Sequence, residues 1–211
     1  MFLTEPITAL TDYAIALECL IFALLLAKQA SRAEGCSAAA LWAIAFGSTA
    51  VAAGLGGTLH GFISSLPMPW AASLWRTMLL AIGLASFAML MGTSVGTQPH
   101  RGQGLLRLVA LGKLAAYGLW AWRADYFIGA IADYLLSMLL VVLLLQRVIP
   151  QAAATRWILG GVFLAVAAAL VQGMQLALQP WLTPNDLYHL VQMLSLYGFF
   201  RGATQLSRGT D

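Results

Sequence analysis

Polar side chains recur at helical spacing in the last apolar segment of the chain, and their types suit a metal site or a structural hydrogen-bond network. Asp186, His189 and Gln192 stand three residues apart, so a helix would carry them on one stripe. Asn185 lies one turn before His189. Imidazole and carboxylate groups fixed on a helix suit Zn²⁺, which would activate water at an open coordination position. The same groups suit a structural hydrogen-bond network in which Asp186 orients His189. Spacing alone favours the network, because the apolar segments contain only two histidines.

Carboxylate, imidazole and guanidinium side chains also occur in the first three apolar segments, at depths that correspond to that of the stripe in the last segment. If the first, second and seventh segments are neighbours, these groups converge with the stripe of the last segment. We therefore expect one polar site, in which Arg76 neutralises a carboxylate. The expected metal ligands are His60, His189, Asp186 and Glu18, the expected catalytic carboxylates are Glu18 and Asp186, and the surrounding polar groups are Asp12, Arg76, Asn185 and Gln192.

A second charged pair lies away from these residues. Lys113 in the fourth apolar segment and Asp133 in the fifth stand at similar depth, and we expect them to form an intramembrane ion pair with a structural role. The seventh segment contains no lysine, which disfavours a retinal-binding opsin.

The elements that must position these residues are apolar helices. The chain has 211 residues, of which 61% are hydrophobic and 9% are charged, whereas a soluble domain carries about 25% charged residues. A chain in lipid must satisfy its backbone polar groups internally, so its apolar segments should be helices. The sequence predicts an all-α membrane protein, a single seven-transmembrane helix bundle over residues 1–211. The expected spans are 9–28, 38–62, 71–96, 104–122, 124–147, 154–178 and 185–205.

Basic residues predict the orientation of the bundle. With the N-terminus outside, the inner loops and tail hold eight Lys and Arg residues and the outer side holds only Arg76 and Arg123. No basic region precedes the first apolar segment, so we expect that segment to stay as a span and not to be cleaved as a signal peptide. The sequence thus predicts a multi-pass protein of the cell (inner) membrane, N-out and C-in.

Two short segments resemble a known superfamily of seven-helix membrane proteins, the alkaline ceramidases and progestin/adiponectin-type receptors. The segment from Asn185 to His189 resembles the last-span motif of two histidines one turn apart, and the segment from Gly56 to Phe62 resembles the span-two histidine segment. The resemblance implies a Zn²⁺-dependent hydrolase that cleaves a lipid amide or ester. The first histidine of the family's pair falls on Asn185 and its serine on Gly56, so Glu18 or Asp186 would replace the missing ligands.

Two interpretations compete with a hydrolase. A small-solute transporter or receptor is favoured by an internal echo, in which Asp12-Tyr13 opens the first segment and Asp125-Tyr126 opens the fifth. Such an echo fits a 3+1+3 repeat around the fourth segment, with Glu18, Lys113 and Asp133 lining a path. A haem held between His60 and His189 is a third interpretation. The net charge of +3 is small and no nucleotide-binding motif is present, so the expected partners are membrane lipids, including a lipid substrate for an enzyme, and no nucleic acid.

Overall fold

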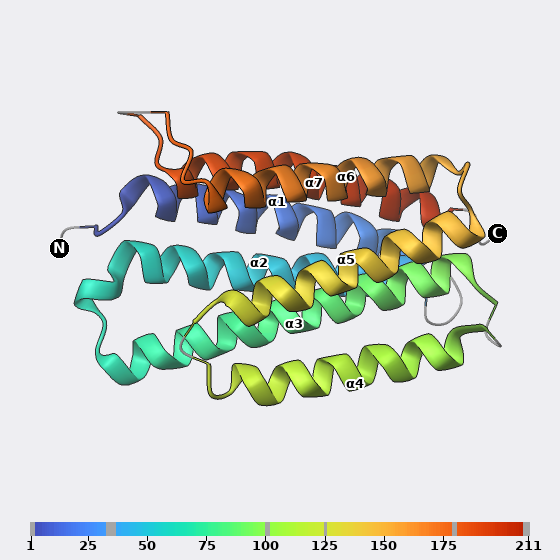
Figure 1. Ribbon diagram of the computed structural model, residues 1–211, viewed down its shortest axis with the longest axis horizontal. Coiled ribbons are helices and arrows are strands. Elements are labelled where there is room, and N and C mark those ends of the chain that lie inside the picture. Colours follow the sequence, from blue (N-terminus) through green and yellow to red (C-terminus); the bar gives the residue numbers. More distant parts are fainter. Residues whose placement is uncertain (1–2, 33–36, 100–101, 125, 179–180, 209–211) are drawn as a thin grey trace.

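The computed structural model describes residues 3–32, 37–99, 102–124, 126–178 and 181–208 (Figure 1). The regular elements in these ranges are helices, which confirms the predicted all-α class. They are α1 (Pro6–Ala30), α2 (Ala38–Phe62), the short 3₁₀ helix η1 (Ile63–Ser65), α3 (Met68–Thr97), α4 (Gln103–Ala121), α5 (Ile128–Val148), α6 (Ala153–Gly173) and α7 (Pro184–Leu206). By length and composition, six of these described helices can cross a membrane, and α7 is not among them.

Local chemistry explains where several helices begin and end. Proline occupies the first turn of α1, α3 and α7, where its missing N–H costs no intrahelical hydrogen bond. The sixth segment ends as a helix at Gly173, earlier than the expected 178, because Gln175 adopts a left-handed backbone conformation (φ 54°). Beyond it the backbone of Leu178 pairs with that of Leu182.

The turn between α4 and α5 is longer than the apolar sequence indicates. α5 begins at Ile128 and not at the expected 124. Backbone hydrogen bonds from Arg123 to Trp120 and from Ala124 to Ala121 close the turn, and Trp75 Nε1 donates to the carbonyl of Ala124 at 3.1 Å. Two residues used in the sequence interpretation lie outside the described residues. They are Arg101, one of the eight basic residues assigned to the inner side, and Asp125, which opens the fifth segment.

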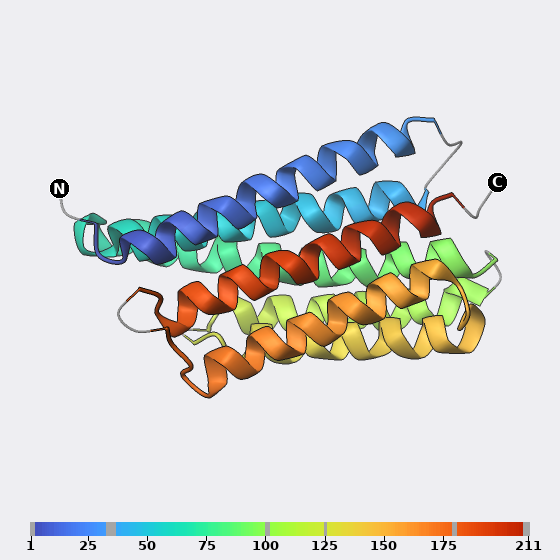
Figure 2. The same cartoon turned by 90° about the horizontal axis from the view of Figure 1, so that it is seen from above.

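The helices run along one long axis, and the chain ends lie at opposite ends of the bundle (Figures 1 and 2). We call the end where α1 and α7 begin the N-terminal end, and the opposite one the C-terminal end. α3 contacts α2, α4, α5 and α7, whereas α4 contacts only α3 and α5 among the helix pairs with substantial contact. α1 contacts both α2 and α7, and α2 contacts α7. The expected neighbourhood of the first, second and seventh segments is therefore confirmed.

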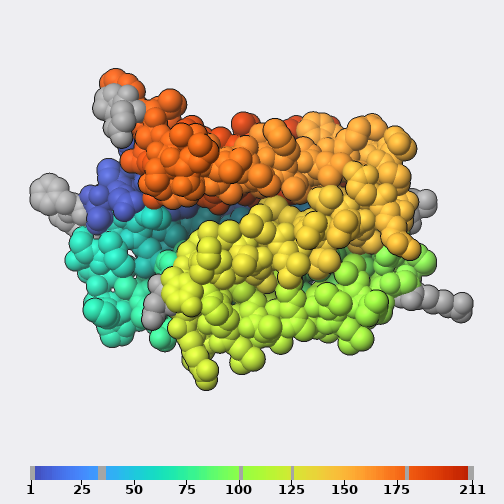
Figure 3. Space-filling model, in the orientation of Figure 1, coloured from blue at the N-terminus to red at the C-terminus, as the bar shows by residue number. Residues whose placement is uncertain are grey.

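Large apolar side chains cover much of the outer surface. On α4, Leu105, Leu108 and Leu119 are each more than two thirds exposed, and the space-filling view shows α4, α5 and α6 forming one broad face (Figure 3). Such a surface suits hydrocarbon and would be a liability in water. This exposure agrees with a multi-pass membrane protein.

Glycines let two helix pairs approach closely. A Cβ added to Gly57 of α2 would lie 3.0 Å from both Asp12 Cβ and the Ala9 carbonyl oxygen of α1. A Cβ added to Gly198 of α7 would lie 3.0 Å from the Cα of Gly161 on α6. Small residues at helix contacts are the usual means of close packing in membrane proteins. The first of these contacts presses Asp12 against α2.

Candidate functional site

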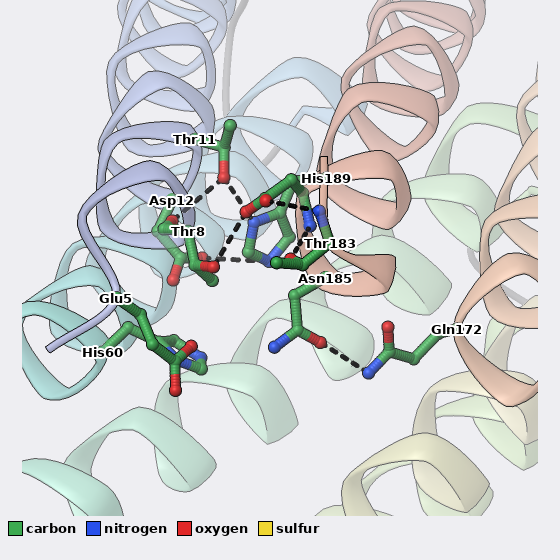
Figure 4. Close-up of polar contacts among 10 residues, drawn as sticks. Glu5, Thr8, Thr11, Asp12, His60, Gln172, Thr183, Asn185 and His189 are labelled. Atoms are coloured by element: carbon green, nitrogen blue, oxygen red, sulfur yellow. Dashed lines mark hydrogen bonds and ion pairs between the residues drawn. The ribbon is translucent and has the colours of Figure 1, made fainter. Parts of the chain in front are cut away.

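A buried polar cluster joins α1 to α7 near the N-terminal end of the bundle (Figure 4). We call it the α1–α7 polar cluster; its members are Thr8, Thr11, Asp12, Asp186 and His189. Thr8 Oγ1 donates to Asp186 Oδ1 at 2.8 Å, and Thr11 Oγ1 lies 2.8 Å from His189 Nδ1. His189 Nε2 lies 3.4 Å from Asp12 Oδ1. Four of the five residues are buried, and Thr11 is half-buried.

The start of α7 fixes Asp186 in place. Thr183 and Asp186 form a capping box, in which the Thr183 N–H donates to Asp186 Oδ2 at 2.8 Å and the Asp186 N–H donates to Thr183 Oγ1 at 3.3 Å. Such a box satisfies backbone donors that a helix start leaves unpaired. With Thr8 on its other oxygen, Asp186 has both carboxylate oxygens engaged. Asp186 therefore anchors α7 to α1 and does not orient His189, which corrects the role expected for it.

Asp12 is held differently from Asp186. Its Oδ1 faces the His189 ring, while its Oδ2 is buried without a hydrogen-bond partner among the described residues. A Cβ added to Gly56 would lie 3.4 Å from that oxygen, so the absence of a side chain there leaves Oδ2 facing α2. A buried carboxylate oxygen that lacks a donor is costly. Asp12 is thus the member of the cluster with spare capacity to bind a proton or a donor group.

The hydrogen bonds of the cluster can be arranged for two protonation states without moving any heavy atom. In one state Thr11 donates to His189 Nδ1, and the Nε2–H of the neutral imidazole points at an ionised Asp12. In the other, the added proton is on His189 Nδ1, which donates to Thr11; Thr11 then donates to the Thr8 carbonyl oxygen at 2.9 Å, and the proton between Nε2 and Asp12 stays in place. Turning the Thr11 hydroxyl therefore accompanies the uptake of one proton.

The second predicted histidine makes a separate contact. His60 Nδ1 lies 2.8 Å from Glu5 Oε2, at the end of α2. Backbone hydrogen bonds from Thr4 to the Gly61 carbonyl and from Glu5 to the His60 carbonyl clamp the start of the chain against this end. Figure 4 shows the Glu5–His60 pair apart from the ring of His189. The two histidines lie at the same end of the bundle, but they engage different partners.

The predicted metal ligands do not fit a zinc site in this arrangement. Among the described residues, no three His, Cys, Asp or Glu side chains form a group able to hold a metal ion. Asp186 has both oxygens in hydrogen bonds, and the two histidines bind different side chains. Glu18 stands six residues beyond Asp12 on α1, a rise of about 9 Å, and its Oε2 is buried without a partner in the described part of the chain. A haem between the two histidines would need a free ring nitrogen on each, whereas His189 engages Thr11 and Asp12 and His60 engages Glu5.

The remaining predicted polar residues lie around the cluster or away from it. Asn185 Oδ1 accepts a hydrogen bond from Gln172 Nε2 of α6 at 2.5 Å. Gln192 is half-buried further along α7. Arg76 is exposed and its guanidinium lies 5.9 Å from the centre of the Trp122 ring. The expectation that Arg76 neutralises a carboxylate is therefore wrong for the described residues.

The other predicted pair forms a compact ion cluster between three helices. Lys113 Nζ of α4 donates to Asp133 Oδ1 of α5 at 2.5 Å and to Ser86 Oγ of α3 at 3.0 Å, and Ser86 donates to Asp133 Oδ2. The Lys113 and Asp133 side chains are 8% and 4% exposed. The structure thus brings the two charges together and saturates both carboxylate oxygens.

Several contributors were absent from the predicted site. Thr8 lies one helical turn before Asp12 and three residues before Thr11, but nothing in the sequence fixed the face of the first helix that meets α7, so neither threonine was predicted. Thr183-Pro184 followed by Asp186 is a recognisable capping signature. Ser86 carries no comparable signal.

The chain belongs to a family of unknown function, DUF6962, whose family model matches residues 7–208. The match reaches from the first turn of α1 to just beyond the end of α7. No curated protein and no solved structure matches the chain. The resemblance to the ceramidase-like superfamily therefore stays a prediction.

Proposed function

We propose that this member of the DUF6962 family is a transporter in the cell membrane that exchanges protons for a small cationic solute, with its N-terminus outside and its C-terminus in the cytoplasm. The observation that carries the proposal is the buried Asp12–His189 pair, in which one carboxylate oxygen has no partner among the described residues. Ionisable residues inside spanning helices are costly, and they commonly mark ion and proton pathways.

The orientation is supported by the unequal distribution of basic residues between the two ends of the bundle. It is tested with single cysteines in a Cys19→Ala, Cys36→Ala background. Ser64→Cys, beyond α2, should react with a membrane-impermeant maleimide in intact cells, whereas Ser31→Cys, at the end of α1, should react only after lysis. The reverse pattern would invert the topology.

The proton half of the exchange is supported by the two hydrogen-bond arrangements of Thr11, His189 and Asp12. Each arrangement gives the Thr11 hydroxyl and His189 Nδ1 a hydrogen-bond partner and leaves Nε2 facing Asp12 at 3.4 Å, so the cluster can hold or release a proton without moving its heavy atoms. A centre of this kind suits a reaction in which a proton leaves as another cation arrives.

The positive charge of the proposed solute is supported by two buried acceptor atoms that have no hydrogen-bond donor among the described residues. Asp12 Oδ2 and Gln172 Oε1 are both buried acceptors without a partner in the described part of the chain. The hydrogen bond between Gln172 and Asn185 places Gln172 Oε1 near the start of α7. Acceptors without donors suit a ligand that brings N–H groups and a positive charge, such as an amine or a guanidinium compound.

Uptake of radiolabelled guanidinium into proteoliposomes tests the exchange. Guanidinium stays charged at neutral pH, so it does not cross the bilayer as a free base. With an acidic lumen, wild-type protein should accumulate the label several-fold above protein-free liposomes. Asp12→Asn should remove this uptake, and the matched control Arg76→Ala, on an exposed residue outside the cluster, should retain it. Equal uptake by the wild type and Asp12→Asn would reject the proposal.

A lipid ester or amide hydrolase is the second candidate, supported by the order hydroxyl, imidazole and carboxylate in Thr11, His189 and Asp12. Here Thr11 Oγ1 would attack the acyl carbonyl while His189, oriented by Asp12, accepts its proton and passes it to the departing alcohol or amine. Water would then hydrolyse the acyl-threonine and release the fatty acid. Release of fatty acid from a fluorescent lipid ester should then survive Thr11→Ser and be lost in Thr11→Val. An undetectable wild-type rate would set this candidate aside.

A further inference from the structure

A half-buried arginine, Arg201, and two exposed aromatic rings lie together near the C-terminal end of the bundle. Arg201 Nη1 of α7 donates to the hydroxyl of Tyr197, one turn earlier, at 2.8 Å. The Arg201 guanidinium carbon lies 4.8 Å from the centre of the Trp157 ring of α6 and 5.8 Å from that of Tyr197. The two rings stand edge to face at 6.1 Å. We call this group the arginine box.

The arginine box lies at the depth of a membrane interface. Trp157 is four residues from the start of α6 and Arg201 five residues from the end of α7, so each lies roughly 6–8 Å from its helix end. Trp157 is 37% exposed and Tyr197 41% exposed, so the box faces the surroundings of the bundle. Arginine and aromatic side chains at this depth lie where headgroups meet acyl chains.

The positive charge of the arginine box is not neutralised by the described part of the protein. The ion pairs among the described residues use Glu5, Asp12 and Asp133, and none involves Arg201. Tyr197 takes one of the five guanidinium donors, so others stay free for a ligand. Arg156, which is exposed and precedes Trp157 in the chain, adds positive charge beside the box. The box therefore attracts an anion and has the donors to bind it.

The surface beside the arginine box is apolar along one line of α7. Leu190, Leu194 and Tyr197 precede Arg201 at spacings that place all four on one face, and the first three are each at least 41% exposed. An acyl chain can lie along this line while its headgroup meets the guanidinium. A free inorganic anion would use the charge and leave the apolar line uncovered.

We infer that the arginine box binds the phosphate of an anionic phospholipid whose acyl chain runs along α7. Arg201 donates to the phosphate oxygens, Trp157 and Tyr197 hold the guanidinium in place, and an anionic headgroup brings no ammonium charge into the basic surroundings. In the proposed orientation this lipid belongs to the cytoplasmic leaflet. The site is separate from the proposed exchange and does not depend on it.

Native mass spectrometry of the full chain in detergent, titrated with phosphatidylglycerol, tests the inference. Wild-type protein should retain one lipid, and Arg201→Gln should bind it about tenfold more weakly, as expected for the loss of one charge-assisted contact. Arg208→Gln, an exposed arginine at the same end, is the matched control and should bind as the wild type does. Tyr197→Phe removes the hydroxyl that orients Arg201 and should give a smaller loss.

Three results would overturn the inference. One is equal affinity of the wild type and Arg201→Gln for phosphatidylglycerol, with circular dichroism showing both to be folded. Another is an equal loss in Arg208→Gln, which would indicate diffuse attraction to positive charge. The third is competition by inorganic phosphate at concentrations matching those of the lipid, which would indicate an anion site without a lipid component.

Discussion

Two buried carboxylates on spanning helices, Asp133 and Asp12, are treated in opposite ways. Asp133 receives Lys113 on one oxygen and Ser86 on the other, so its charge is paired and its acceptors are filled. Asp12 meets only the ring of His189, at 3.4 Å, and its second oxygen has no partner among the described residues. The ion cluster of Ser86, Lys113 and Asp133 therefore has the features of a structural contact that holds α3, α4 and α5 together. The α1–α7 polar cluster has the features of a centre that can change its protonation.

The largest expected loss of stability comes from breaking the Lys113–Asp133 ion pair. Asp133→Asn leaves the buried Lys113 charge unpaired and should destabilise the protein by about 3–5 kcal/mol, measured by thermal unfolding in detergent. The double variant Lys113→Met, Asp133→Leu removes both charges and should recover most of the loss. If the single variant unfolds at the same temperature as the wild type, the ion pair does not stabilise the fold.

A smaller effect is expected where α2 presses on α1. Gly57→Ala adds a methyl group 3.0 Å from Asp12 Cβ and the Ala9 carbonyl oxygen, and should cost about 1–3 kcal/mol. Gly112→Ala on α4 is the matched control, because its Cβ would meet nothing within 4 Å. Thermal unfolding should separate the two variants. Equal melting temperatures would mean that α1 and α2 are not closely packed at Asp12.

The cap of α7 should contribute about as much as a single hydrogen-bonded group. Thr183→Ala removes the side chain that accepts the Asp186 N–H and should cost about 1 kcal/mol. Thr183→Ser keeps the hydroxyl and should restore stability. A melting temperature for Thr183→Ala equal to that of Thr183→Ser would show that the capping box does not stabilise α7.

The smallest effect on stability is expected at Asp12 itself. Asp12→Asn keeps the shape, removes a buried charge that is poorly paired, and should change the unfolding free energy by less than about 1 kcal/mol. The same variant should lose guanidinium uptake. A strong destabilisation would make Asp12 a structural residue like Asp133 and remove the contrast between the two clusters.

The helices were largely predictable because a bilayer demands long apolar segments. Residues 38–62 were expected as a helix and form α2 with those bounds. The α4–α5 turn was misplaced because Arg123 alone was taken as the break, and the Asp125-Tyr126 step after it suits the interfacial start of a helix as well as a turn.

The candidate site was predictable only in part. The stripe of Asp186 and His189 was readable from spacing, and both side chains are buried. Their partners Thr8 and Thr11 were not, because lipid-facing and core-facing sides of a membrane helix are similarly apolar and no periodicity reveals the rotation of α1. His60 was assigned to the wrong partner because Glu5, which binds it, lies outside the apolar segments that guided the prediction.

Proton release on cation binding tests the central claim most directly. Purified protein in weakly buffered detergent solution is mixed with guanidinium while a pH indicator reports the change in acidity. The exchange at Asp12 and His189 predicts the release of about one proton per chain by the wild type and by Arg76→Ala, and none by Asp12→Asn. No release by the wild type, or the same release by Asp12→Asn, would contradict it.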